Sequence, residues 1–295
     1  MDELKYGSDF DVTKLLEPEV IANPYPYYAM LREQAPQFGL LDYPPGTVPG
    51  VDEPNPAWVF TRYDDVVGVL KGHEMFSSRD PMQEASDAPT LMLVNHDRPR
   101  HTLLRNIAKK AFTPKRVVTD IAPLVTQTIS EMINGLVESE IDFMKEVAGV
   151  LPSVVMTFLI GTPRDDYPKL VRWANAFMVS SDFTLEERQQ CNIELFQYYS
   201  TKVAECYAKI ERGETVPDTL MAAFIRAEDE GQHLTKEDVV LFCITLVVAG
   251  AETTTYLLGN LVSTLEGVTI DRSDERQRLS CSENEGRRAG SFGRG

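Results

Sequence analysis

Two short segments of this sequence carry residue types at spacings that could do chemistry, and the first of them is basic. Residues 98–117 read RPRHTLLRNIAKKAFTPKRV, with His101 and Arg105 four positions apart. On a helix, side chains at this spacing project from one face about one turn apart. A histidine and an arginine so placed can donate hydrogen bonds to a pair of carboxylates. A solvated basic helix face is the simpler alternative, and the spacing alone leaves both open.

The second segment is apolar and contains an acid beside an alcohol. Residues 246–260 read LVVAGAETTTYLLGN, in which Ala249 and Gly250 are followed closely by Glu252 and Thr253. A mid-helix glycine costs about 1 kcal/mol relative to alanine, and a helix tolerates this where something approaches its backbone closely. A carboxylate in an apolar run needs a partner, water or a function. The alternative is helix–helix packing on small residues, next to an ordinary exposed glutamate.

Composition and charge exclude several classes of protein. The 295 residues contain 29 Lys and Arg against 45 Asp and Glu, for a net charge of −16. Nucleic-acid affinity rests largely on basic side chains, so we expect no nucleic-acid partner. The start of the chain, MDELKYGSDFDV, lacks the basic and apolar regions of a signal peptide. The longest apolar run, 239–251, is shorter than the ~20 residues of a membrane span, so it predicts a buried helix and no membrane association.

The cysteines and histidines predict neither a disulfide scaffold nor a metal site. The four cysteines form no CxxC pair, which is typical of a reducing compartment, and we expect a cytoplasmic protein. The four histidines form no HExxH motif, so no metal-binding set of side chains is predicted. The cysteines are Cys191, Cys206, Cys243 and Cys281.

The elements that must position these segments are mostly helices. Apolar residues recur every three or four positions from residue 98 onward, whereas residues 58–61 (WVFT) form a β-type run. The fold class predicted is therefore mostly α with a small β-sheet near the N-terminus, and residues 77–97 are predicted to be a loop. The predicted helical segments are 99–111, 115–136, 144–160, 166–179, 184–212, 217–230 and 236–265.

The composition changes near residue 265, which suggests a boundary. Residues 266–295 contain six Arg and no Lys, and too few large apolar residues to form a core layer. We expect residues 1–265 to form one folded part and 266–295 an atypical, disordered tail. The apolar helix before the tail should pack against something, so we also expect a chain that has lost its true continuation.

Taken in order, these motifs resemble the cytochrome P-450 family of heme-thiolate monooxygenases. HTLLR resembles the helix C signature of the family, and AGAETT resembles its helix I signature. NPYPYYAMLREQAP is similar to the helix A opening, WVFTRYDDVVGVL to the first strand and helix B, and GTPRDDYPKLVRWANAF to the segment that leads into helix F. The resemblance covers residues from about 20 to 265.

The resemblance implies a partial cytochrome P-450 fold and a heme cofactor. His101 and Arg105 would then bind the heme propionates, and Ala249 and Gly250 would let the distal helix lie against the porphyrin. Glu252 and Thr253 would handle proton delivery to dioxygen. The implied activity is insertion of one oxygen atom from O2 into a small apolar organic substrate.

The resemblance also implies an electron donor, and the sequence departs from the family at one essential feature. A basic strip at Lys109, Lys110, Lys115 and Arg116 suggests a ferredoxin-type donor. The glycine-rich loop that delivers the axial cysteine thiolate is missing, so we expect an inactive fragment of a monooxygenase. The alternative is a non-catalytic helical binding protein for heme or an apolar ligand.

Overall fold

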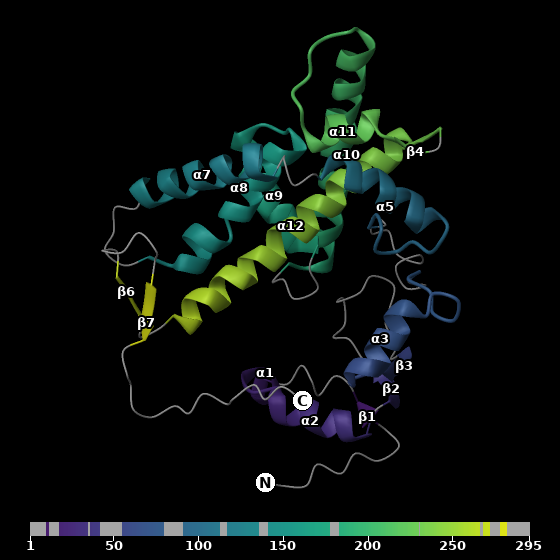
Figure 1. Ribbon diagram of the computed structural model, residues 1–295, viewed down its shortest axis with the longest axis vertical. Helices are drawn as coiled ribbons and strands as arrows, with labels where there is room; N and C mark the ends of the chain where they lie inside the picture. The colour runs from purple at the N-terminus through teal and green to yellow at the C-terminus, as the bar shows by residue number, and fades with distance from the viewer. Residues whose placement is uncertain are drawn as a thin grey trace.

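The structure is a computed structural model in which a small N-terminal sheet unit precedes a larger helical body (Figure 1). The fold class predicted from the sequence, mostly α with a small sheet near the N-terminus, is confirmed. The residues that the structure describes are 10–11, 18–34, 36–41, 55–79, 91–112, 117–135, 141–177, 183–229, 231–265, 268–271 and 278–281.

The N-terminal unit is a three-stranded sheet flanked by short helices. Its strand order is β1-β2-β3, with β1 parallel and β3 antiparallel to β2. Phe38 lies opposite Trp58 across β2 and β3, with ring centroids 5.3 Å apart, and such aromatic cross-strand pairs stabilise a sheet. The elements are β1 (Phe10–Asp11), α1 (Pro18–Ala22), α2 (Tyr25–Gln34), β2 (Gln37–Leu41), β3 (Asn55–Val59) and α3 (Tyr63–Lys71).

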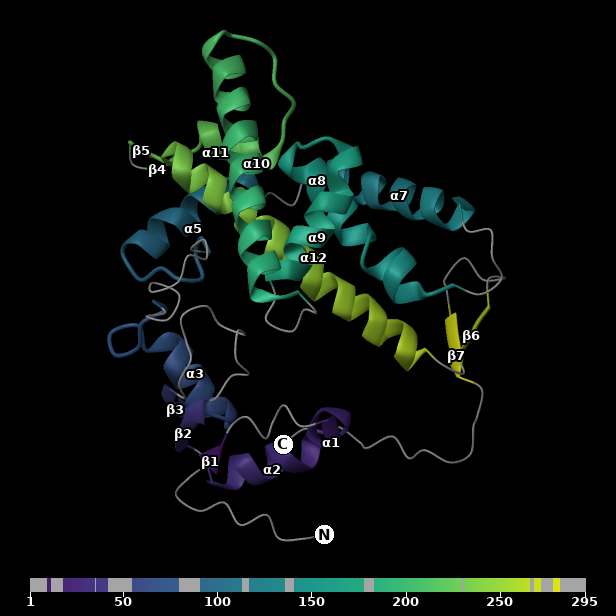
Figure 2. The same ribbon diagram turned by 180° about the vertical axis from the view of Figure 1, so that it is seen from behind.

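The helical body is built around α12 (Lys236–Thr264), which runs obliquely through it (Figures 1 and 2). Helices α8, α9, α10 and α11 contact α12, and α7 packs on α8. The other elements of the body are α5 (Arg100–Ala111), η2 (Val117–Ile121), α7 (Ala122–Gly135), η3 (Met144–Ala148), α8 (Leu151–Ile160), η4 (Arg164–Asp166), α9 (Tyr167–Phe177), α10 (Leu185–Glu211), α11 (Leu220–Arg226), β4 (Glu228–Asp229) and β5 (Gln232–His233).

Local sequence signals set the ends of the longest helices. Thr184 and Thr235 begin α10 and α12 with capping boxes, in which each threonine hydroxyl accepts from the amide three residues on. Gly161 ends α8 in the left-handed region at φ 95°, where a glycine carries no Cβ penalty. A Cβ there would also meet Thr219, the residue that caps α11.

The core lies where α12 meets α8, α9 and α10. Tyr199 of α10 and Phe242 of α12 are among the largest fully buried side chains, and Phe242 stacks on Phe224 of α11 at 4.8 Å. By length and composition α12 could cross a membrane, and half of its most apolar stretch is buried inside the protein. The sequence predicted this helix over 236–265, and it predicted burial for the apolar run 239–251 within it.

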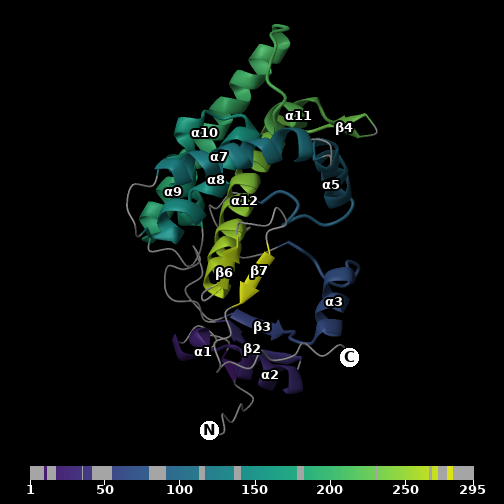
Figure 3. The same ribbon diagram turned by 60° about the vertical axis from the view of Figure 1, so that its left-hand side comes forward.

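The segment after α12 contains two short strands that the sequence analysis did not predict. β6 (Val268–Asp271) and β7 (Arg278–Cys281) pair antiparallel, with Val268 opposite Cys281. The pair lies beyond the C-terminal end of α12 (Figure 3). The division of the chain at residue 265 stays a prediction.

Candidate functional site

Helix α5 exposes the face that carries the two predicted cofactor-binding side chains. Leu104 and Ile107 are fully buried and hold α5 on the body. His101 is half-buried, whereas Arg105 and Lys109 are exposed. The three positions are spaced four apart, so they form one polar stripe along the helix.

Two contacts made across long stretches of chain fix α5 and the loop before it against α12. The buried amide of Met92 donates a hydrogen bond to Thr245 Oγ1 at 2.8 Å. The guanidinium of Arg100 pairs with the Asp238 carboxylate at 2.6 Å. Asp238 also accepts from the Thr235 amide in the capping box, so one carboxylate links the start of α12 to the start of α5.

This cluster perturbs two titratable groups. Burial raises the pKa of Asp238, but the hydrogen bonds from Arg100 and Thr235 lower it by more than burial raises it. The pKa of Asp238 is therefore below the usual range of an aspartate. Burial lowers the pKa of His96, and the nearby Arg100 and His101 lower it too, against an opposing effect of Asp238. His96 Nδ1 is buried, and a backbone hydrogen bond at Leu91 also acts to raise the pKa.

One cavity joins Arg105 to α12. It has a volume of about 280 Å³, and its lining includes Leu93, Arg105 and Lys109 on one side and Phe242 and Leu246 on the other. The walls are mainly apolar, and the two cations carry its charge. A cavity of this kind suits a carboxylate borne by an apolar body.

Ala249 and Thr253 lie on an uncovered face of α12. Both are exposed, and Thr253 Oγ1 donates to the Ala249 carbonyl at 2.9 Å. Leu246 and Thr253 are seven residues apart, so they share a face about two turns, or ~10 Å, along the axis. Leu257, 66% exposed, continues this face. Leu246, which lines the cavity together with Arg105, therefore lies on the same face of α12 as Thr253.

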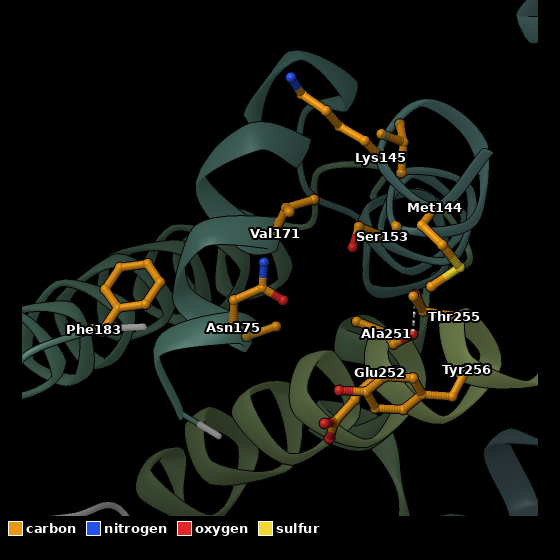
Figure 4. A pocket seen from close by; sticks show the side chains of 13 residues that line it. Met144, Lys145, Ser153, Val171, Asn175, Phe183, Ala251, Glu252, Thr255 and Tyr256 are labelled. Atoms are coloured by element: carbon orange, nitrogen blue, oxygen red, sulfur yellow. Dashed lines mark hydrogen bonds between the residues drawn. The ribbon is translucent and has the colours of Figure 1, made fainter. Parts of the chain in front are cut away.

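Gly250 and Glu252 point elsewhere. A Cβ on Gly250 would lie 2.7 Å from Met156 Sδ, so this glycine permits close packing of α12 on α8. This contact agrees with the alternative interpretation, in which the small residues allow two helices to pack closely. A contact between Gly250 and a porphyrin remains a prediction. Glu252 is half-buried and lines a different cavity between α8, α9 and α12 (Figure 4). The structure thus places His101 and Arg105 on one face of α5 and Ala249 and Thr253 on one face of α12, and it directs Gly250 and Glu252 to other neighbours.

The predicted basic strip is only partly available for docking. Lys109 is exposed, but Lys110 pairs with Asp229 at 2.9 Å and also donates to the Glu228 carbonyl. These contacts dock the β4–β5 hairpin on α5. Lys115 and Arg116 lie outside the described residues, as do residues 80–90 of the predicted loop at 77–97.

Sequence reasoning missed the contacts that position the site. Thr245 is a lone hydroxyl within the apolar run 239–251, and its buried position signals a hydrogen-bonding role. Asp238 was visible as part of the pattern TKED, which is typical of a capping box. Their partners, Met92 and Arg100, could not be inferred because they lie more than 130 residues away.

Comparison with known proteins defines the family. The sequence profile of the family described as Cytochrome P450 matches residues 51–262. Cytochrome P450 109 of Bacillus spizizenii is 30% identical over 264 residues, which cover 86% of this chain and 59% of the relative. The methyl-branched lipid omega-hydroxylase of Mycobacterium tuberculosis is 30% identical over 241 residues, covering 77% of this chain and 54% of the relative.

Solved structures agree with the sequence comparison. Cytochrome P450 CYP109Q5 from Chondromyces apiculatus superposes with a TM-score of 0.68 at 27% identity, covering 88% of this chain and 61% of that one. CYP109E1 from Bacillus megaterium, in complex with testosterone, gives a TM-score of 0.63 at 28% identity, covering 82% and 59%. The chain belongs to the cytochrome P450 family and has a partial P450 fold of the bacterial type. It spans less than two thirds of the length of these relatives.

Family membership implies a heme cofactor, and the described residues fit part of that group. His101 and Arg105 are donors suited to propionates, and the uncovered face at Ala249 leaves room beside the backbone of α12. The cysteines with described side chains do not fit as axial ligands. Cys191 and Cys243 are buried, Cys206 is half-buried, and burial raises the pKa of all three thiols, which disfavours the thiolate.

Proposed function

We propose that this chain provides the propionate-binding and oxygen-side elements of a heme-dependent monooxygenase, which inserts one oxygen atom from O2 into a small organic substrate. The observation that carries the proposal is the uncovered face of α12 at Ala249 and Thr253, which also includes Leu246, a lining residue of the cavity at Arg105. A buried position for these residues would leave no room for a planar cofactor.

Each residue has a defined part in this proposal. His101 and Arg105 hold the two propionates by charge-assisted hydrogen bonds, because both are donors on one face of α5. Ala249 allows close approach to the α12 backbone. Thr253 Oγ1 gives its hydrogen to the Ala249 carbonyl, so its lone pairs remain free to accept and position a proton donor. When bound, the heme supplies the redox chemistry that activates dioxygen.

Glu252 is the proposed proton carrier. Glu252 is adjacent to Thr253 in sequence, but its side chain lines the cavity on another side of α12. The carboxylate can exchange protons with that cavity and, after rotation of the side chain, present a proton to the face that carries Thr253. The family resemblance supports this assignment, and no charged partner within the described residues holds the carboxylate in place.

Substrate and partners are proposed at the level of chemical class. One relative is named for branched lipids and another was solved with testosterone, so we propose a small apolar substrate. A ferredoxin-type donor would meet Lys109 and the basic end of α5. We propose a cytoplasmic protein, supported by α12 being half buried within the protein and by bacterial relatives.

A second candidate is binding of heme or another apolar ligand without oxygen insertion. It is favoured by the burial of Cys191 and Cys243, which keeps both thiols away from the uncovered face of α12. Under this proposal the same residues bind the macrocycle, and no oxygen chemistry follows.

Titration of the purified chain with hemin tests the proposed site. We expect a saturable Soret change that Arg105→Gln and Ala249→Leu both weaken, the first by removing a propionate partner and the second by filling the open face. Lys209→Gln and Ala204→Leu are matched controls, because both change an exposed residue of α10. Equal binding by all four variants would contradict the site.

The carbon monoxide complex of the reduced, heme-loaded chain separates the two candidates. A Soret band typical of thiolate ligation would support the monooxygenase and contradict the non-catalytic alternative. A band typical of nitrogen or water ligation would support heme binding without oxygen insertion. If hemin causes no saturable Soret change, both the monooxygenase and the proposal of heme binding without oxygen insertion are rejected.

A further inference from the structure

A second cavity, separate from the proposed heme face, lies between α8, α9 and α12. Its volume is about 400 Å³, which is within the range of small-molecule sites. Figure 4 shows Ser153 and Asn175 directed into it from α8 and α9, with Glu252 below them on α12. Three helices therefore bring three polar side chains to one space.

These three polar groups have no hydrogen-bond or ion-pair partner within the described residues. Ser153 is only 2% exposed, yet its hydroxyl makes no hydrogen bond to the described part of the chain. The hydroxyl faces the cavity, where it can form a hydrogen bond with a ligand or with water. Glu252 is half-buried, and no cation of the described residues neutralises it.

The charge and shape of the cavity define the ligand class. The carboxylate of Glu252 calls for a cation, and Tyr256, one turn further along α12, can add its ring face to the same cation. Val171, Ala174 and Phe183 supply apolar walls. Lys145 also lines the cavity, but it is exposed and extends away from Glu252 in Figure 4.

We propose that this cavity binds a small protonated primary amine with a compact apolar body. Its ammonium group donates to Glu252 and to the oxygens of Ser153 and Asn175, and its hydrocarbon part lies against Val171 and Phe183. A primary ammonium has three donors, one for each of these three polar groups that line the cavity. The inference goes beyond the proposed function and needs no heme. Because Glu252 is also the proposed proton carrier, an amine bound here would act as an inhibitor of that role.

Calorimetric titration of the heme-free chain with cyclohexylamine near neutral pH tests the proposal. Cyclohexanol and cyclohexanecarboxylate have the same ring with a neutral and an anionic group, so they separate charge recognition from apolar binding. We expect saturable binding of the amine, and at least about tenfold weaker binding of both analogues, because a charge-assisted hydrogen bond is lost. Equal binding of amine and alcohol, or no saturable binding of the amine, would overturn the proposal.

Variants locate the site. Glu252→Gln keeps the shape of the side chain and is expected to weaken amine binding by at least about tenfold. Glu237→Gln removes the same charge from an exposed position in the first turn of α12 and should leave binding unchanged. Lys145→Ala should not weaken binding. Amide NMR shifts on amine addition should map to α8, α9 and α12; shifts elsewhere, or an unaffected Glu252→Gln variant, would place the amine at another site.

Discussion

Replacement of Thr245 by valine should reveal how much the hydrogen bond between α12 and the loop before α5 contributes to the free energy of unfolding. Thr245 Oγ1 accepts a hydrogen bond from the Met92 amide at 2.8 Å, and Met92 is 1% exposed. Valine has nearly the same shape but no oxygen, so the Met92 amide would be left buried without a partner. This costs about 1–3 kcal/mol, whereas the Leu241 carbonyl, which also accepts from Thr245, keeps its helical bond.

Urea unfolding and amide hydrogen exchange measure this effect. The free energy of unfolding of Thr245→Val should fall by about 1–3 kcal/mol, and exchange of the Met92 amide should become about five- to 150-fold faster. Weaker hemin binding should accompany the change, because Leu93 follows Met92 and lines the cavity with Arg105.

Thr253→Val is a matched control on the same helix. Thr253 is exposed, and within the described residues its hydroxyl donates a hydrogen bond to the Ala249 carbonyl of the same helix, so the change should stay within about 0.5 kcal/mol. If Thr245→Val is as stable as Thr253→Val, the buried amide is satisfied in another way and the reasoning fails.

Three further predictions concern stability, pH and thiol chemistry. Gly161→Ala should lower the free energy of unfolding by about 2–4 kcal/mol, since it adds left-handed strain and a clash with Thr219; a loss below 1 kcal/mol in a urea titration would refute this. The folded-state pKa of His96 is below its unfolded value, so stability should fall as pH drops below about 6.5, and His96→Gln should flatten this slope in unfolding measured from pH 7.5 to 5.5. Because burial raises the pKa of their thiols, Cys191 and Cys243 should react with iodoacetamide at neutral pH only after denaturant is added, as followed by mass spectrometry; rapid labelling of the native chain would contradict the burial.

The long helices could be predicted from the sequence with small errors because their signals are local. Residues 184–212 and 236–265 were predicted as helices, and the structure has Leu185–Glu211 and Lys236–Thr264. Each begins at a threonine whose capping partner lies three residues on, within the reach of a sequence window. The short strands β1, β2, β4 and β5 were not predicted, because each is stabilised by a partner strand rather than by its own pattern.

The predicted site residues were found by motif, but their arrangement required the tertiary structure. The spacing of His101 and Arg105 placed them on one face of a helix, and α5 confirms that they form one stripe. Ala249 and Gly250 are neighbours in sequence, yet one is exposed and the other packs against Met156.

The sequence by itself determined the family, the helical class and which side chains share a helix face, because periodicity and capping are properties of consecutive residues. Only the tertiary structure decided what each face meets. It placed Glu252 in a cavity with Ser153 and Asn175, and left Thr253 on an uncovered face. The physical reason is that a helix turns 100° per residue, so adjacent residues of one motif face different neighbours, and those neighbours come from parts of the chain that no local pattern identifies.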